Sequence, residues 1–234
     1  MLATQITDIV VHTSAGFGNL KSMQDFWKNT LGWKTPGYHV FIETDGTKHY
    51  LLPFNTPSNG VAGYNSHIIN ICYQGGVEKA GIDKRGQVIW KGKDTRTTEQ
   101  KIAILEVIQE IRHYLATNGK VISKGLGIVG HRDFSPDKDG NGVVAPWERI
   151  KECPCFEAMT EYRQYTSPDR RDILPTIKTP SPAIVAPAFT HIHVVVKGDT
   201  LSKIANSYKV SLVDIYSKNN LTSTVIKIGQ KLKI

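Results

Sequence analysis

The sequence is poor in the features that mark secreted disulfide-rich proteins and membrane-spanning proteins. Its 234 residues include only three cysteines, and two of these are separated by Pro154 alone. An odd number of cysteines at this spacing does not suit a disulfide framework and favours a metal ligand or a free thiol. No apolar run approaches the roughly 18 residues that a membrane-spanning helix needs. We therefore expect no membrane-spanning segment.

The amino-terminal segment lacks a secretory signal as well. Residues 1–5 carry no basic side chain, and the apolar stretch of roughly 7–15 residues that a signal peptide requires does not follow them. We therefore expect the protein to be made in the cytoplasm without a signal peptide, wherever it acts.

The positive charge of the chain is concentrated near its carboxyl end. The net charge is +8, yet residues 1–164 carry 19 basic and 17 acidic side chains, whereas residues 191–234 carry seven basic and two acidic ones. This excess indicates an anionic partner for the carboxyl-terminal part. Charge alone leaves nucleic acid, a membrane surface and the anionic bacterial wall open.

Proline use divides the chain into two domains. Residues 166–190 hold five of the 11 prolines, together with Ser, Thr and Ala, a composition typical of an extended linker. We expect a first domain over residues 1–164, a linker over residues 165–190 and a second domain over residues 191–234.

Short β-branched and apolar runs predict the strands of the first domain. The expected strands are residues 6–12, 38–43, 48–52, 66–73 and 121–129. Asp45-Gly46 between the second and third of these is a strong hairpin signal. Residues 83–90 read as a small hairpin or a loop.

Two helices are expected between these strands. Ser22 precedes a short helix over residues 23–31, and Thr97 forms a capping box with Gln100 at the start of a helix that ends near Thr117. Strands that alternate with helices predict an α/β domain whose central sheet is covered on at least one face. In such domains ligand sites gather at the ends of strands.

The second domain has its own compact pattern. A β-branched run at residues 194–196 precedes two short helices, the second with Ser211 and Asp214 in capping-box spacing, and residues 226–234 form a closing strand.

Histidine and cysteine at strand ends indicate a metal site in the first domain. His131 ends an apolar run, and Cys153 follows a loop rich in Gly, Asp and Pro. Histidine and thiolate are preferred zinc ligands, and a catalytic zinc needs three protein ligands with one open position. His12, at the end of the first strand, is the natural candidate for the third ligand. By contrast, Cys72 within an apolar strand reads as a core residue, and Cys155 as a packing thiol.

An acidic loop precedes Cys153. Asp137, Asp139, Asn141 and Glu148 fit the pattern D-x-[DN]-x-[DN]-G-x₅-E, whose oxygen atoms suit Ca²⁺. Pro146 lies inside the loop and no clear helix precedes it, so an ordinary turn and a calcium loop both remain open. Bound calcium would stiffen the connection between His131 and Lys151.

The ordered motifs of the first domain resemble the zinc-dependent N-acetylmuramoyl-L-alanine amidases of the phage-lysozyme and peptidoglycan-recognition-protein type. The matching segments are residues 11–15 (VHTSA), 37–39 (GYH), 45–47 (DGT), 63–65 (GYN), 130–133 (GHRD) and 151–154 (KECP). The resemblance implies a central mixed β-sheet with flanking helices. It also implies that His12, His131 and Cys153 hold zinc and that Tyr38 and Lys151 are catalytic.

The second domain resembles a lysin motif (LysM), a small βααβ domain. The matching segments are residues 198–201 (GDTL), 204–205 (IA), 219–221 (NNL), 228–230 (IGQ) and 232–234 (LKI). The sequence departs from the pattern at His193, where tyrosine is usual.

Together the two resemblances imply a peptidoglycan hydrolase. It would cut the amide between N-acetylmuramic acid and L-alanine of the stem peptide, with zinc-activated water as the nucleophile, while the LysM binds N-acetylglucosamine units of the glycan. A phage or prophage endolysin that acts as a monomer on the wall after release, without a nucleic-acid partner, fits both. A non-catalytic recognition protein on the same fold and a zinc peptidase that cuts within the stem peptide are the alternatives.

Overall fold

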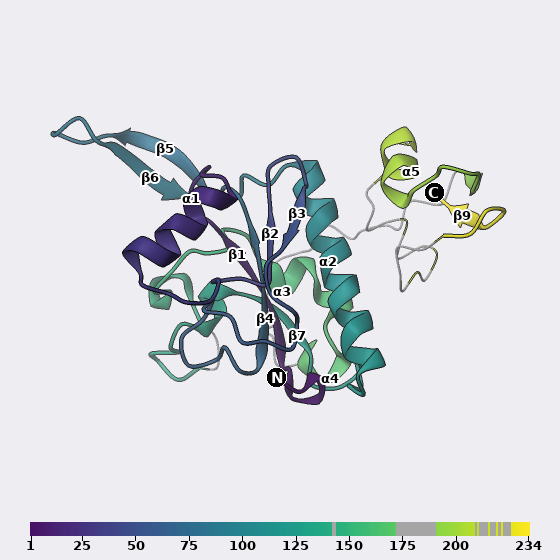
Figure 1. The fold of residues 1–234 in the computed structure, drawn as a ribbon, viewed down its shortest axis with the longest axis horizontal. Coiled ribbons are helices and arrows are strands. Elements are labelled where there is room, and N and C mark those ends of the chain that lie inside the picture. Colours follow the sequence, from purple (N-terminus) through teal and green to yellow (C-terminus); the bar gives the residue numbers. More distant parts are fainter. Residues whose placement is uncertain are drawn as a thin grey trace.

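The computed structural model describes residues 1–141, 144–171, 191–208 and 226–234, and the single positions 210, 215, 219 and 221. The first two ranges form one α/β domain around a five-stranded sheet (Figure 1). The remaining ranges belong to a small carboxyl-terminal unit.

The central sheet is mixed, as expected. Its strands are β1 (Asp8–Thr13), β2 (Val40–Ile42), β3 (Lys48–Tyr50), β4 (Ile68–Tyr73) and β7 (Gly127–Gly130). In space they follow the order β3-β2-β4-β1-β7. Strands β2, β4, β1 and β7 are parallel, and only β3, which pairs with β2 through the expected hairpin, is antiparallel. The histidine-bearing strand β1 therefore lies between two parallel neighbours.

Alternating side chains give the sheet two different faces. Ile9, Val11, Ile69 and Ile71 belong to the main core, which also contains the apolar residues of α2 (Thr98–Thr117). Side chains of the opposite alternation, such as Val10, contribute to a separate smaller cluster, and His12 shares their parity. In Figure 1, α2 lies on one side of the sheet and α1 (Leu20–Asp25) on the other. The face that carries His12 is thus free of the long helix.

The expected cap of α2 is confirmed. The Thr97 hydroxyl accepts a hydrogen bond from the Gln100 backbone N–H at 3.0 Å, and the Gln100 side chain accepts one from the Thr97 N–H at 3.1 Å. Two unpaired donors of the first turn are thereby satisfied, which fixes the start of the helix.

Most expected strands differ from the structure by one or two residues at their ends, and two elements start well away from the predicted residue. The amino-terminal helix is capped by Asn19, whose side chain accepts a hydrogen bond from the Ser22 N–H at 3.0 Å, and it continues as the π-helical turn η2 (Phe26–Thr30). The strand expected over residues 121–129 begins only at Gly127, because a turn closed by Lys124 N–H to Val121 C=O, and Gly125 at φ +63°, precede it.

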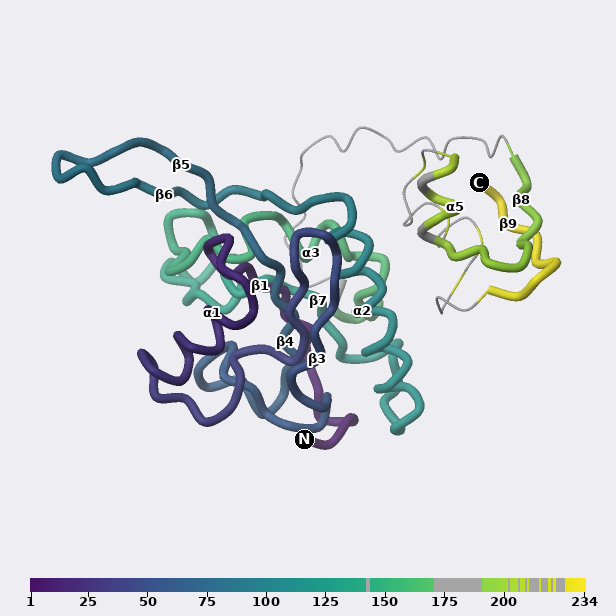
Figure 2. The backbone as a smooth tube through the Cα atoms, turned by 45° about the horizontal axis from the view of Figure 1, so that its top comes forward, coloured from purple at the N-terminus to yellow at the C-terminus, as the bar shows by residue number. Residues whose placement is uncertain are grey.

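The hairpin expected near residues 83–90 is much longer than predicted. Strands β5 (Val77–Ile82) and β6 (Val88–Gly92) pair with each other in a separate two-stranded sheet. We call this element the β5–β6 ribbon. Figures 1 and 2 show that it extends away from the central sheet.

Short helical turns complete the first domain. They are η1 (Ala3–Gln5), η3 (His131–Phe134), η4 (Pro146–Glu148), α3 (Ala158–Glu161), η5 (Arg163–Tyr165) and α4 (Pro168–Arg171). The start of the expected linker packs on this domain, because the Ser167 N–H donates to the Leu126 carbonyl at 2.9 Å and Arg170 pairs with Asp8 at 2.6 Å. Residues 172–190 of that linker lie outside the described residues.

The carboxyl-terminal unit pairs β8 (Ile192–Val194) with β9 (Lys231–Lys233) and contains α5 (Leu201–Tyr208). The expected second helix, with Ser211 and Asp214, lies outside the described residues. Within the part of the chain that the structure describes, no helix is long and apolar enough to cross a membrane.

Candidate metal centre and active site

Three segments that are distant in the sequence bring the predicted ligands together. His12 comes from the end of β1, His131 begins η3 directly after β7, and Cys153 lies 22 residues further along the chain. Their ligand atoms all lie within 4.8 Å of one another. Cys153 Sγ is 3.8 Å from His12 Nδ1. The parallel pairing of β1 with β7 explains the first two positions, since their carboxyl ends meet at one edge of the sheet.

Backbone contacts hold Cys153 in this position. The Thr13 N–H donates to Cys153 Sγ at 3.2 Å, and the Arg132 N–H donates to the Cys153 carbonyl at 2.8 Å. Gly130 makes room for the same segment, because a Cβ at this residue would come within 2.3 Å of Pro154 Cδ. The cysteine is therefore fixed to both histidine-bearing segments, the end of β1 and the start of η3.

A buried asparagine orients His12. Asn70 Oδ1 lies 2.8 Å from His12 Nε2, and Asn70 Nδ2 donates to Ser58 Oγ at 2.7 Å. With the amide oxygen facing Nε2, that nitrogen carries the proton and Nδ1 keeps its lone pair for a metal ion. Both His12 and Asn70 are fully buried, so water does not compete for these hydrogen bonds.

The electrostatics of the site keep both imidazoles neutral. Burial, together with the nearby His131, lowers the pKa of His12 to about 3. Burial and the charge of Lys151 lower the pKa of His131 to about 4. Neutral imidazole is the form that binds metal. The donor set therefore fits a divalent cation at neutral pH.

The protonation state of Cys153 also depends on a nearby cation. Burial raises the pKa of the Cys153 thiol to about 12, although the Thr13 N–H and the Lys151 charge act in the opposite direction. Such a thiol stays protonated unless a positive ion lies beside it, and a coordinating metal ion removes the proton outright. Two neutral imidazoles and one such thiol are a ligand set typical of catalytic zinc.

Tyr38 lies beside the metal ligands. Its ring centroid is 5.0 Å from that of His12 and 5.5 Å from that of Trp27. Burial raises the pKa of the Tyr38 phenol well above its usual value. Tyr38 therefore remains a hydrogen-bond donor at neutral pH.

Lys151 completes the group of predicted site residues. Its side chain is exposed, and its charge is close enough to lower the pKa values of His12, His131 and Cys153. It thus places a positive charge at the solvent side of the ligand group.

The other two cysteines are not among the three grouped ligands, although Cys72 lies within hydrogen-bonding reach of the Tyr38 phenol. Cys72 is fully buried in β4, as expected for a core residue. Cys155 Sγ donates to the Gly76 carbonyl at 3.2 Å, and its φ of +68° marks a tight turn after Pro154.

The acidic loop is organised by one of its own carboxylates. Oxygen atoms of Asp137, Asp139 and Glu148 lie within 4.8 Å of one another. However, buried Glu148 already accepts backbone N–H groups of Lys138, Asp139 and Ala145 at 2.6, 3.2 and 2.7 Å. Gly142 of the expected pattern lies outside the described residues. Calcium binding by Asp137, Asp139, Asn141 and Glu148 stays a prediction without structural support.

Sequence reasoning missed the partners of the ligands. Asn70 and Ser58 were not expected at the site, nor was the role of the Thr13 N–H. The lone asparagine within the apolar run of residues 68–73 was the available signal, because a buried polar side chain needs a partner.

Comparisons with known proteins agree with the two resemblances. A family model described as N-acetylmuramoyl-L-alanine amidase matches residues 2–154, and a LysM domain model matches residues 193–234. An uncharacterized protein of Haemophilus influenzae is 34% identical over 97 residues, which cover 42% of this chain and 69% of the relative. An endolysin of Enterobacteria phage K11 is 26% identical over 156 residues, which cover 65% of this chain and 83% of the relative. The solved structure of PGRP-SA from Apis mellifera, 14% identical, aligns over 69% of this chain and 84% of its own with a TM-score of 0.48.

Proposed function

Because the chain belongs to the N-acetylmuramoyl-L-alanine amidase family, we propose that it hydrolyses the amide between N-acetylmuramic acid and L-alanine in peptidoglycan. The observation that carries this proposal is the convergence of His12, His131 and Cys153 within 4.8 Å beside Tyr38. A non-catalytic wall-binding protein would have no need for this ligand set.

His12, His131 and Cys153 would hold the metal ion, and the donor set suits zinc. When bound, zinc polarises the scissile carbonyl and lowers the pKa of water to about 7. Asn70 keeps the His12 ring in the orientation that presents Nδ1.

Lys151 and Tyr38 act on the substrate. The Lys151 ammonium group stabilises the negative charge that develops on the carbonyl oxygen during attack. Tyr38, whose raised pKa keeps the phenol protonated, donates a hydrogen bond that orients the attacking water or the substrate oxygen. In this protonated form the Tyr38 phenol positions these groups.

The carboxyl-terminal LysM domain (residues 193–234) anchors the enzyme to the wall through N-acetylglucosamine units of the glycan. Its excess of basic side chains favours approach to an anionic polymer. Anchoring raises the local concentration of the catalytic domain near its substrate through the connecting chain.

We further propose an endolysin-like role. The protein is made in the cytoplasm, reaches the wall when the membrane is breached, and works there as a monomer, without nucleic acid or membrane as a partner. Similarity to the phage K11 endolysin supports this role. Cell fractionation tests it, and export without lysis would contradict it.

Product analysis tests the chemistry. The purified protein should release new L-alanine amino termini from peptidoglycan without new reducing sugar ends, and a zinc chelator should abolish the release. A different new amino terminus would indicate a stem-peptide peptidase. Wall binding with no product from the zinc-loaded protein would indicate a recognition protein.

A further inference from the structure

One face of the β5–β6 ribbon is apolar and exposed. Ile82 pairs directly with Val88, and Val88 and Trp90 are two residues apart on β6, so all three side chains lie on the same face. Their exposed fractions are 58%, 41% and 55%. A cluster of large exposed apolar side chains on one surface commonly marks a binding site.

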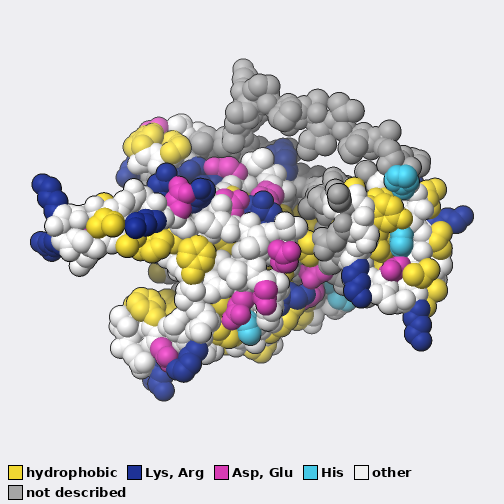
Figure 3. Space-filling model, turned by 90° about the horizontal axis from the view of Figure 1, so that it is seen from above, with side chains coloured by type: hydrophobic (Ala, Val, Ile, Leu, Met, Phe, Trp, Pro, Cys, Tyr) yellow, Lys and Arg dark blue, Asp and Glu magenta, His cyan; other side chains and the backbone are white. Residues whose placement is uncertain are grey.

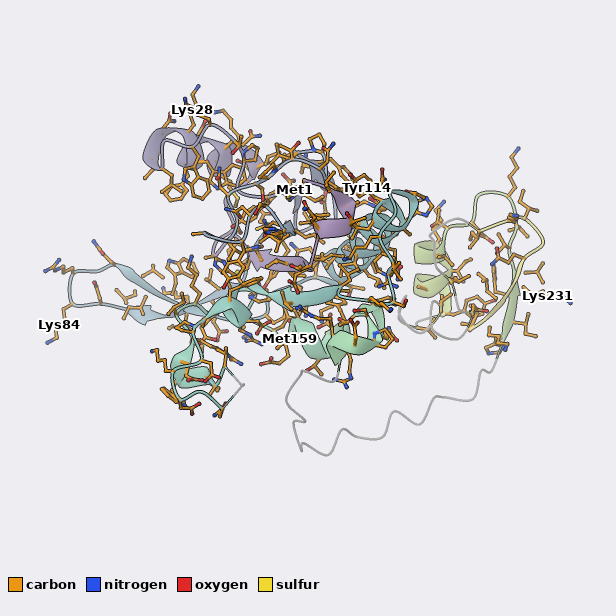
Figure 4. All side chains as sticks on the ribbon, turned by 90° about the horizontal axis from the view of Figure 1, so that it is seen from below. Met1, Lys28, Lys84, Tyr114, Met159 and Lys231 are labelled. Carbon is orange, nitrogen blue, oxygen red and sulfur yellow. The ribbon has the colours of Figure 1, made fainter. Side chains whose placement is uncertain are left out.

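The opposite face of the ribbon carries one exposed apolar side chain, Ile89, beside an acidic residue that is paired with lysines. Glu78 pairs with Lys91 at 3.0 Å and also with Lys93. By contrast, Lys79, Lys84 and Arg85 have no ion-pair partner among the described residues. Figure 3 shows basic side chains at the end of the ribbon and apolar ones along it, and Figure 4 labels Lys84 at that end. The ribbon therefore offers apolar surface together with free positive charge.

The apolar face of the ribbon reaches the segment of residues 151–155 that carries Cys153. Gly92 shares the face of Val88 and Trp90 by alternation, and a Cβ at Gly92 would lie 3.1 Å from Glu152 Cβ and 3.2 Å from Cys155 Sγ. The Lys93 N–H donates to the Gly76 carbonyl at 3.0 Å and anchors the base of the ribbon. Trp90 is two residues from Gly92, or ~7 Å along the strand. The face thus starts at the segment that carries Lys151 and Cys153 and leads outward.

The distribution of charge along the ribbon indicates which class of molecule it binds. The connecting turn, residues 83–87 (DKRGQ), is polar throughout, and the apolar side chains lie between it and the base. A ribbon that entered a bilayer tip first would bury charged groups, which is costly. An extended polymer lying along the ribbon would contact the apolar face and the basic turn together.

We propose that this face binds the peptidoglycan strand beyond the scissile amide. The Trp90 indole stacks on the C–H face of a sugar ring, and Lys79, Lys84 and Arg85 attract carboxylates of stem peptides on the same strand. The inference rests on the proposed amidase function, since it takes its partner from that substrate. It assigns the ribbon a role in holding long wall fragments, separate from the chemistry at the metal centre.

Kinetics on long and short substrates test the role of the ribbon. The full-length Trp90→Ala variant should raise KM on polymeric peptidoglycan about tenfold, the factor that ~1.4 kcal/mol of lost binding gives. The kcat value on the polymer should stay unchanged, as should both constants on a soluble N-acetylmuramoyl tripeptide, which lacks the neighbouring sugars and stem peptides of the strand. Tyr50→Ala, which removes an aromatic ring that is 52% exposed on β3, is the matched control and should behave as wild type.

A binding measurement separates this inference from the proposed function. Affinity for the polymer is measured in the full-length Cys153→Ser variant, with and without Trp90→Ala, and needs no bond to be cut. A weaker affinity with Trp90→Ala supports the ribbon site even if no amidase activity is found. Equal affinities and equal polymer KM values with and without Trp90→Ala would overturn the inference. It would also be overturned if Trp90→Ala weakened binding to vesicles of anionic phospholipid and left polymer binding intact.

Discussion

Asn70 faces His12 across two neighbouring parallel strands, with its amide oxygen 2.8 Å from Nε2 of the imidazole. The contact fixes which ring nitrogen carries the proton and leaves Nδ1 directed at Cys153. Gly60 is part of the same arrangement, because a Cβ at this residue would lie 2.5 Å from Asn70 Cγ. A side chain at Gly60 would displace Asn70, so this loop glycine helps to keep the hydrogen bond that orients the His12 ring.

Asn70→Ala should weaken zinc binding by roughly 10–100-fold, the usual cost of removing a partner that orients a metal-ligating histidine. Competition with a chromophoric chelator measures the affinity. Asn70→Asp keeps an acceptor for His12 Nε2 and should retain most of the zinc affinity. If both variants bind zinc as tightly as the wild type, Asn70 has no orienting role.

The two neighbouring cysteines provide a matched pair for testing the third ligand. Cys153→Ser should lose bound zinc and lower kcat/KM by more than the ~10–100-fold expected for an outer partner, because it removes a ligand itself. Cys155→Ser should keep both, since the Cys155 sulfur bonds to the backbone of Gly76 and Lys93 and is not one of the three grouped ligands. Metal analysis and steady-state kinetics on both variants decide the matter. Zinc retention by Cys153→Ser together with loss by Cys155→Ser would reverse the assignment.

Lys151→Ala and Tyr38→Phe should each lower kcat by a factor on the order of 10²–10³, the typical cost of losing one preorganised donor at an oxyanion. Bound zinc should be unchanged in both variants, since neither residue is a ligand. Glu152→Gln changes an exposed charge next to Lys151 and serves as the control. Loss of zinc in Tyr38→Phe would instead indicate a structural role for the phenol.

Much of the fold and of the site could be predicted from local patterns. Thr97 and Gln100 lie close in the sequence and form their capping box whatever surrounds them. His12 and His131 end apolar runs, and parallel strands bring such ends together. The capping box depends on spacing within one segment, and the meeting of the two histidines follows from a general rule of parallel sheets. Both can therefore be predicted from the sequence.

Features that depend on contacts between distant segments could not be predicted in this way. The bond from Asn70 to His12 requires knowing that β4 lies beside β1. The length of the β5–β6 ribbon was also missed. Every residue of β6 is exposed, so the sequence lacks the alternation of apolar and polar residues that marks a half-buried strand. The short β7 was missed because the turn before it interrupts a run that is apolar enough for a longer strand.

Glu148 should stabilise the loop before Cys153 without calcium. Glu148→Ala leaves the N–H groups of Lys138, Asp139 and Ala145 without their acceptor, and should lower the free energy of unfolding by roughly 1–3 kcal/mol. Thermal unfolding of the wild type should be unaffected by millimolar calcium. A clear rise in the wild-type melting temperature with calcium, absent in Glu148→Ala, would restore the calcium-loop interpretation.

His39 should make the metal-free protein sensitive to acid. It is fully buried, its Nδ1 accepts the Asn70 N–H at 2.9 Å, and its Nε2 donates to the Thr56 carbonyl at 2.9 Å. Burial lowers the pKa of His39 to about 4 from 6.5. As pH falls below about 6.5 the unfolded chain takes up the proton first, so stability is lost progressively down to about pH 4, by about 3 kcal/mol in total.

Denaturant unfolding at several pH values checks this prediction. Metal-free His39→Gln should be less stable than the wild type at pH 7, and its stability should fall less steeply between pH 6.5 and pH 4. The difference between the two slopes isolates His39 from His12 and His131, whose pKa values are lowered in the same direction. Identical slopes would mean that His39 keeps an ordinary pKa in the folded state, and that the hydrogen bond from the Asn70 N–H does not depend on a neutral ring.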